Sequence, residues 1–126
     1  MSLCIRPVVE TWGESITYSS RETDIWERLE QLADLAGIDS TNFHSTQYGN
    51  DLTVFWVYEG GKFLDFLSEA GMGTRIVNQL ETEELLSGGA EEREREAEDL
   101  RDICAMAESW RKSIDPADGS LRIYCD

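Results

Sequence analysis

Residues 52–58 read Leu-Thr-Val-Phe-Trp-Val-Tyr, and this segment contains the longest apolar run in the chain. Only Thr53 interrupts the apolar residues. Because successive side chains of a strand point to opposite faces, both faces of such a strand would avoid water. The pattern is typical of a central strand that is covered on both sides. We therefore predict a central strand with helices packed against its sheet, and a core position for Trp56.

The residues before this strand predict its partner. Residues 43–48 form a second strand-like segment, and Gly49-Asn50 separates it from residues 51–58. A Gly-Asn pair between two strands favours a tight hairpin turn. We therefore expect an antiparallel hairpin over residues 43–58.

Helical spacing of apolar residues predicts the elements on either side of the hairpin. In the clearest helix, Ile25, Leu29 and Leu32 recur about one turn apart, and Gly37 takes the position of a left-handed C-terminal cap. Pro7 has no N–H, so the first strand should be an edge strand or carry a bulge. The other expected elements are strands at 3–9 and 15–19, helices at 63–70, 74–86 and 90–114, and a strand at 121–124.

The order of these elements predicts an α+β fold with a single domain over residues 1–126. We expect a small, mostly antiparallel sheet of about four to five strands, packed by three to four helices. A chain of 126 residues with 40% hydrophobic residues is long enough to bury one core. The most linker-like point, residues 87–89, lies too near the end of the sequence to bound a second domain.

The charge balance restricts the possible partners. The chain carries 26 acidic and 11 basic residues, a formal net charge of −15. Such a surface repels phosphate groups, which disfavours direct binding to nucleic acid and to anionic lipid. A basic protein partner is favoured, because opposite fields raise encounter rates. The first residues lack the basic and apolar regions of a signal peptide, and no apolar run is long enough to cross a bilayer, so we expect a cytoplasmic protein.

The three cysteines agree with a reducing compartment. Cys4, Cys104 and Cys125 are odd in number and lack the spacing of a metal site. Cys4 and Cys125 both fall on predicted strands near opposite ends of the sequence. Whether these two residues approach each other is left open by the sequence.

Much of the negative charge is concentrated around the last predicted helix. Residues 81–108 contain eleven acidic residues and three arginines, a net charge of −8. Residues 91–96 include no apolar side chain, so we expect these turns to project into solvent, to fray or to meet a basic group. Two interpretations stay open: a solvated helix surface, or a surface that binds a basic partner. The carboxylates of that surface are those of Glu91, Glu92, Glu94, Glu96 and Glu98.

The first strand of the hairpin supplies a second candidate surface. Phe43, His44 and Tyr48 lie in or beside a segment rich in Ser, Thr and Gln that little else would bury. Aromatic residues in such places are favoured anchors of protein interfaces. His44 is the single histidine, and no Ser or Cys lies at a catalytic spacing from it. We expect His44 to be an ordinary strand residue.

No motif predicts a cofactor, a metal or a catalytic residue. Residues 71–74, Gly-Met-Gly-Thr, precede a helix, but they follow another helix and lack the Gly-Lys-Ser/Thr of a phosphate-binding loop. The acidic residues form neither a calcium-binding loop nor a Glu-x-x-His pair. We therefore expect no cofactor, no metal and no catalytic site.

These observations favour a small acidic interaction module that inhibits a basic partner. The profile is typical of immunity proteins that neutralise a toxin and of phage counter-defence proteins that act on a nuclease, with carboxylates that mimic nucleic-acid charge. Two alternatives remain. One is a housekeeping protein of a salt-adapted or high-GC organism, which two lysines against nine arginines would suit. The other is an enzyme whose site no motif reveals. The oligomeric state has no indicator in the sequence.

Overall fold

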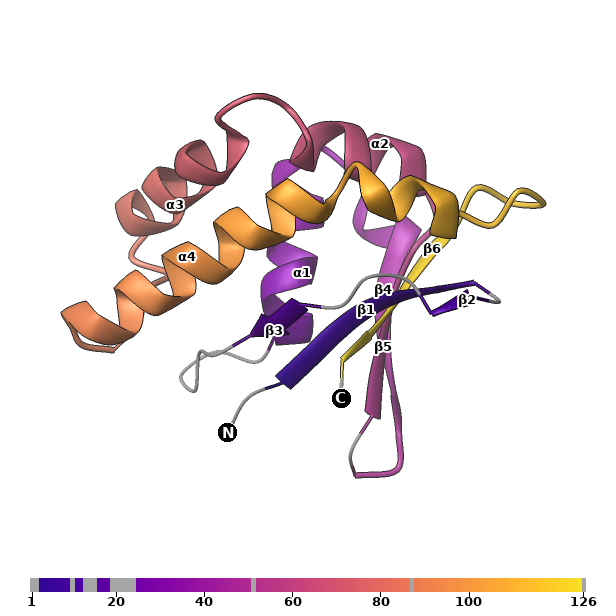
Figure 1. Cartoon of the computed structure of the whole chain (residues 1–126), viewed down its shortest axis with the longest axis horizontal. Helices are drawn as coiled ribbons and strands as arrows, with labels where there is room; N and C mark the ends of the chain where they lie inside the picture. The colour runs from indigo at the N-terminus through magenta and orange to yellow at the C-terminus, as the bar shows by residue number, and fades with distance from the viewer. Residues whose placement is uncertain are drawn as a thin grey trace.

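The computed structural model describes the backbone of residues 3–9, 11–12 and 16–18, and residues 25–50, 52–86 and 88–125 with their side chains. These residues form an α+β domain in which helices pack against an antiparallel sheet (Figure 1). The predicted fold class is confirmed.

The sheet combines strands from both ends of the chain. Its order is β2-β1-β6-β5-β4, β3 also pairs with β1, and all of these pairings are antiparallel. The expected count of four to five strands does not match, because β4, β5 and β6 form a three-stranded unit that β1 extends with two short partners. The strands are β1 (Leu3–Val9), β2 (Thr11–Trp12), β3 (Ile16–Tyr18), β4 (Phe43–Tyr48), β5 (Leu52–Val57) and β6 (Leu121–Cys125).

The α-helices lie on the same side of the sheet (Figure 1). Two short 3-10 helices, η1 and η2, precede β4 and follow the last α-helix. The helices are α1 (Ile25–Leu35), η1 (Ser40–Asn42), α2 (Gly60–Leu67), α3 (Met72–Thr82), α4 (Ala90–Met106) and η2 (Ser109–Ser113).

β5 is a central strand, as predicted, because it pairs with β4 on one side and with β6 on the other. Phe55 and Val57 face the helices and are fully buried. On the opposite face Val54 is 3% exposed, Trp56 is half-buried and Tyr58 is 41% exposed. The prediction of burial on both faces therefore holds at Val54 but is wrong at Trp56 and Tyr58, and the core position of Trp56 is wrong. The reason is that the helices pack on the other side of the sheet.

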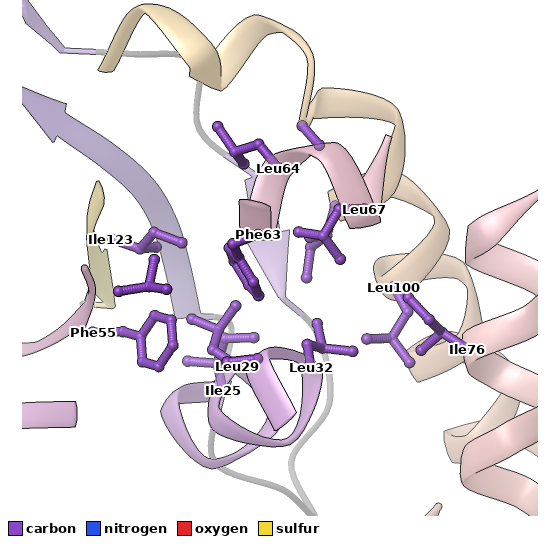
Figure 2. Packing of buried hydrophobic residues seen from close by; sticks show 14 of the residues in the cluster. Ile25, Leu29, Leu32, Phe55, Phe63, Leu64, Leu67, Ile76, Leu100 and Ile123 are labelled. Atoms are coloured by element: carbon purple, nitrogen blue, oxygen red, sulfur yellow. The ribbon is translucent and has the colours of Figure 1, made fainter. Parts of the chain in front are cut away.

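The core fills the space between the sheet and the helices. Figure 2 shows Phe63 of α2 in the middle of this core, with Phe55 of β5 and Leu32 of α1 nearby. The rings of Phe55 and Phe63 lie 5.9 Å apart between centroids. Leu100 of α4 and Ile76 of α3 belong to the same buried cluster. One core therefore joins β5, α1, α2, α3 and α4.

The end of α1 follows the sequence prediction. Gly37 has φ 78°, in the left-handed region that a C-terminal cap needs. Its N–H donates to Asp34 O at 3.0 Å, and the N–H of Ile38 donates to Ala33 O at 3.1 Å. These two bonds are those of a Schellman cap, and Ile38 is buried against the core as its hydrophobic contact.

The three later α-helices differ from their predicted bounds, and α2 spans Gly60–Leu67 instead of residues 63–70. The predicted helix over 90–114 ends at Met106, and the chain continues through the tighter η2. α3 begins at Met72 instead of residue 74 and ends at Thr82 instead of residue 86. Gly73 is part of α3 and lies against α4, where an added Cβ would be 3.0 Å from Arg101 Cγ. A glycine that suggests a break in the sequence here permits close helix packing.

The strand pairings of β1 account for the position of Pro7 within it. Leu3–Ile5 pair with β3, Val8 and Val9 pair with β2, and Pro7 falls between these two pairings while lying opposite Ile123 of β6. A residue without an N–H suits this interval. The register also places Ile5 opposite Cys125, so Cys4 is adjacent to that pair along the backbone. The side chain of Cys4 is outside the described part of the chain.

Candidate functional site

α4 separates the five predicted glutamates into different environments. Glu91, Glu94 and Glu98 are exposed, and Glu92 is half-buried, where Arg95 approaches it at 3.4 Å. Glu96, by contrast, is completely buried. Of the three expected environments, Glu96 takes the one beside a basic group, and its burial removes it from the predicted partner-binding carboxylates. This residue cannot present its charge to a partner in the folded chain.

Glu96 meets a basic group within the same chain. Its Oε1 accepts a hydrogen bond of 2.7 Å from Arg28 Nε, and both side chains are shielded from water. The same guanidinium donates to Gln31 Oε1 and, at 3.0 Å, to the backbone oxygen of Leu85. Arg28 thus connects α1 with α4 and with the segment that follows α3. Sequence reasoning missed this pair because its two members are 68 residues apart.

The exposed carboxylates gather where α3 ends and α4 begins. We call this set the acidic end; its members are Glu81, Glu83, Glu84, Glu91, Glu94 and Glu98. A hollow of about 690 Å³ between the two helices is lined by Glu81, Glu84 and Glu94 but also by Arg93 and Arg101. The hollow itself is mixed in charge, and the exposed carboxylates of the acidic end outnumber the exposed arginines around them, Arg93, Arg95 and Arg101.

The three hairpin residues do not share one surface. Phe43 faces the helices and packs near Phe55, with ring centroids 6.2 Å apart. His44 lies opposite Trp56 on the other face of the sheet, and Tyr48 is 52% exposed. Because side chains alternate along a strand, Phe43 is separated from the other two. The predicted combined aromatic surface is corrected to His44 and Tyr48.

His44 belongs to an aromatic group on the sheet face that the helices leave open. Its ring is stacked on Trp56 at 5.9 Å with an interplanar angle of 11°. Tyr58 Oη lies 3.3 Å from His44 Nδ1, and the Arg122 guanidinium lies 5.2 Å from the centre of the Trp56 ring. These contacts suit an aromatic packing role for His44, with an arginine held by a cation–π interaction.

A second groove lies between α1, the end of α3 and the start of β4. We call it the α1–α3 groove; its volume is about 390 Å³. Its lining residues are Glu27, Glu30, Gln31, Asp34, Leu35, Phe43, Leu80, Glu83 and Leu85. Four of these are acidic and none is a lysine or arginine. Phe43 is the only one of them that the sequence pattern singled out.

The carboxylate of Glu30 is affected by its partial burial and by the negative charges of this groove. Partial burial of its carboxylate raises its pKa, and the nearby Glu27 carboxylate raises it further, while His44 acts in the opposite direction. A raised pKa means that the folded chain holds the proton more tightly than the unfolded chain. Stability contributed by this group is therefore lost as the pH rises through the carboxyl range.

Glu30→Gln should consequently raise the urea midpoint of unfolding near neutral pH. In acid, where the carboxyl is protonated in both states, the midpoint should be unchanged. Glu69→Gln, at an exposed carboxylate that is paired with Arg75, is the control and should give no gain at either pH. An equal gain at both pH values would contradict the electrostatic explanation.

The two described cysteines are poor nucleophiles. Cys104 is half-buried, and burial raises its pKa to about 11, so its thiol stays protonated near neutral pH. Cys125 is buried, and its Sγ lies 3.9 Å from Ile123 O. Within the described part of the chain, no group of three or more His, Cys, Asp or Glu side chains could hold a metal ion.

Comparisons with known proteins give no relative to which these features could be transferred. The chain matches no protein-family model, no curated protein and no solved structure. Of the helices in the described residues, none combines the length and the apolar character needed to cross a membrane. The surfaces of this chain are therefore what indicates its function.

Proposed function

We propose that this chain is an acidic interaction module that binds and inhibits a basic protein, in the manner of an immunity or counter-defence protein. The observation that carries the proposal is the acidic end, where exposed carboxylates of α3 and α4 gather on one part of the surface. The carboxylates of the acidic end are exposed to solvent, whereas Glu96, which pairs with Arg28, is buried.

The physical basis is electrostatic steering. A cluster of like charges raises the local potential and accelerates the encounter with an oppositely charged surface by about 10- to 1000-fold. A toxin or nuclease that binds phosphate groups carries such a basic surface. Carboxylates arranged along a helix would then occupy the place of nucleic-acid phosphates. The net charge of −15 disfavours nucleic acid itself as the partner.

The test compares two variants with the same change in net charge. The first, Glu91→Lys with Glu94→Lys, alters the acidic end. The control, Glu69→Lys with Glu108→Lys, alters exposed residues that line a hollow near the opposite end of α4. Glu91 and Glu108 lie roughly 25 Å apart at the helical rise of about 1.5 Å per residue. Glu96 is left intact, because reversing its charge would place a second cation beside Arg28.

The measurement is the association rate with the protein that the wild-type chain captures from its native host, at low and high ionic strength. We expect the acidic-end variant to associate about tenfold more slowly at low salt, and the control variant to keep most of the wild-type rate. The wild-type rate should fall as salt is added. Equal rates for all three proteins would refute the proposal and favour salt adaptation as the origin of the acidity.

A further inference from the structure

The α1–α3 groove has an apolar floor and, unlike the hollow between α3 and α4, no basic residue in its lining. Leu35, Phe43 and Leu80 line it and are partly or fully buried, while Leu85 is 38% exposed. Leu85 is one of only three large hydrophobic side chains that are exposed in the part of the chain with described side chains. An exposed apolar side chain beside a groove is what a binding surface offers to a partner's apolar anchor.

The wall that carries Leu85 is held in place by specific contacts. Glu84 adopts φ 57°, a left-handed conformation that is uncommon for a residue other than glycine. The N–H of Leu85 donates to Leu80 O at 2.8 Å, and the N–H of Glu84 donates to Glu81 O at 3.1 Å. These are the bonds of a Schellman cap, and both Leu80 and Leu85, the positions that commonly pack together in this motif, line the groove. Arg28 fixes the same segment through Leu85 O.

The charges around the floor define the chemistry of the occupant. Glu27, Asp34 and Glu83 are exposed, Glu30 is half-buried, and no cation is among the lining residues. A second copy of the chain would bring another charge of −15 to this surface and be repelled. A segment that carries lysine or arginine would instead complement the rim. The volume of about 390 Å³ is near the lower end of ligand pockets, and suits one or two side chains.

We infer that the α1–α3 groove is the docking site for a short segment of a basic protein, with an apolar side chain on the floor and flanking arginines or lysines on the rim. This inference deepens the proposed function and rests on it for the identity of the partner as a basic protein. The acidic end then steers the encounter, while the groove fixes the position of the bound segment.

The first experiment uses defined peptides and the full chain labelled with ¹⁵N. The probe is acetyl-Arg-Leu-Arg-Phe-Arg-amide. One control, with serine in place of Leu and Phe, keeps the charge and removes the apolar anchors; another, with Glu in place of Arg, reverses the charge. We expect amide shifts concentrated in α1, Phe43 and residues 83–85, with a Kd on the order of 1 mM. The serine peptide should bind about tenfold more weakly, since it loses burial of two apolar side chains, and the acidic peptide should not bind.

Matched variants then separate the groove from general electrostatics. Glu27→Gln with Asp34→Gln removes two rim charges, Leu85→Ser removes the exposed anchor contact, and Glu91→Gln with Glu94→Gln is the control of equal charge change. Each groove variant should weaken the binding of the probe peptide several-fold. In the charge variant the reason is that each exposed ion pair contributes a few-fold in affinity, and in Leu85→Ser it is the loss of apolar contact. The control should bind it almost as wild type does. Circular dichroism checks that each variant is folded.

Three outcomes would overturn the inference. These are equal affinity for the leucine and serine peptides, shifts concentrated at Glu91–Glu98, or self-association of the chain through the groove in sedimentation experiments. None of them affects the partner kinetics of the Glu91→Lys and Glu94→Lys variant, so the groove can fail while the proposed function stands. Conversely, peptide binding at the groove with unaltered partner kinetics would support the groove and refute steering by the acidic end.

Discussion

Glu96→Ala should lower the free energy of unfolding by about 3–5 kcal/mol, the loss expected when one member of a buried ion pair is removed. The carboxylate of Glu96 and the guanidinium of Arg28 are both shielded from water and 2.7 Å apart. Without Glu96, the guanidinium of Arg28 keeps its positive charge in the protein interior and loses a carboxylate that balances it. Urea denaturation measures the change. Glu94→Ala, at an exposed position on the same helix, should alter stability by about 0.5 kcal/mol or less.

A double replacement separates the ion pair from simple packing. Arg28→Met with Glu96→Leu removes both charges and retains much of the volume, so it should recover most of the stability lost in Glu96→Ala. A single Glu96→Ala variant as stable as wild type would contradict the buried position of the pair. A double variant as unstable as the single one would show that the contacts of Arg28 with Gln31 and Leu85 O matter more than the charge.

Trp110→Ala should cost about 3–5 kcal/mol, as large-to-small substitutions of fully buried aromatic residues do. Trp110 lies in η2 with no exposed surface, in the cluster that joins the helices to the sheet. Its removal leaves a cavity between elements that approach from different parts of the chain. The measurement is the urea midpoint, with the slope of the transition as a check that unfolding stays cooperative.

Trp56→Ala is the matched comparison, and it should cost less, roughly 1–2 kcal/mol, because Trp56 is only half-buried on the open face of the sheet. Its contacts include the His44 and Tyr58 rings and the Arg122 guanidinium. An equal loss from the two tryptophans would mean that the open face is covered as well as the helix side. A larger loss from Trp56 would restore the original core prediction for this residue.

The contrast between the two tryptophans shows where sequence patterns fail. The apolar run at residues 52–58 indicates a central strand, and β5 is one. The run does not indicate how many faces of the sheet the helices cover, because that depends on the side of the sheet on which each helix lies. The same limit applies to Phe43 and His44. Their neighbouring positions suggest one surface, but strand pleating assigns them to opposite faces.

The candidate binding surfaces were also only partly predictable. The concentration of carboxylates between residues 81 and 108 is visible in the sequence, and most of them are exposed. The helical spacing that leads to Leu100 and Ile103 places Glu96, and not Glu94, on the buried side of α4, but it does not reveal the arginine that pairs with Glu96. The groove was also missed, because its rim residues Glu27 and Asp34 come from α1, far from Leu85 in the chain, and each appears in the sequence as an ordinary solvent-facing residue of a helix.

By itself, the sequence determined the features that depend on neighbouring residues. These include the course of α1, its cap at Gly37, the hairpin of β4 and β5, the α+β class and the negative charge around α4. Such features are set by backbone conformation and by contacts within a few residues along the chain. The tertiary structure alone decided the one-sided cover of the sheet, the Arg28–Glu96 pair and the α1–α3 groove. These depend on contacts between residues distant in the sequence, as with the 68 positions between Arg28 and Glu96, and local periodicity carries no information about them.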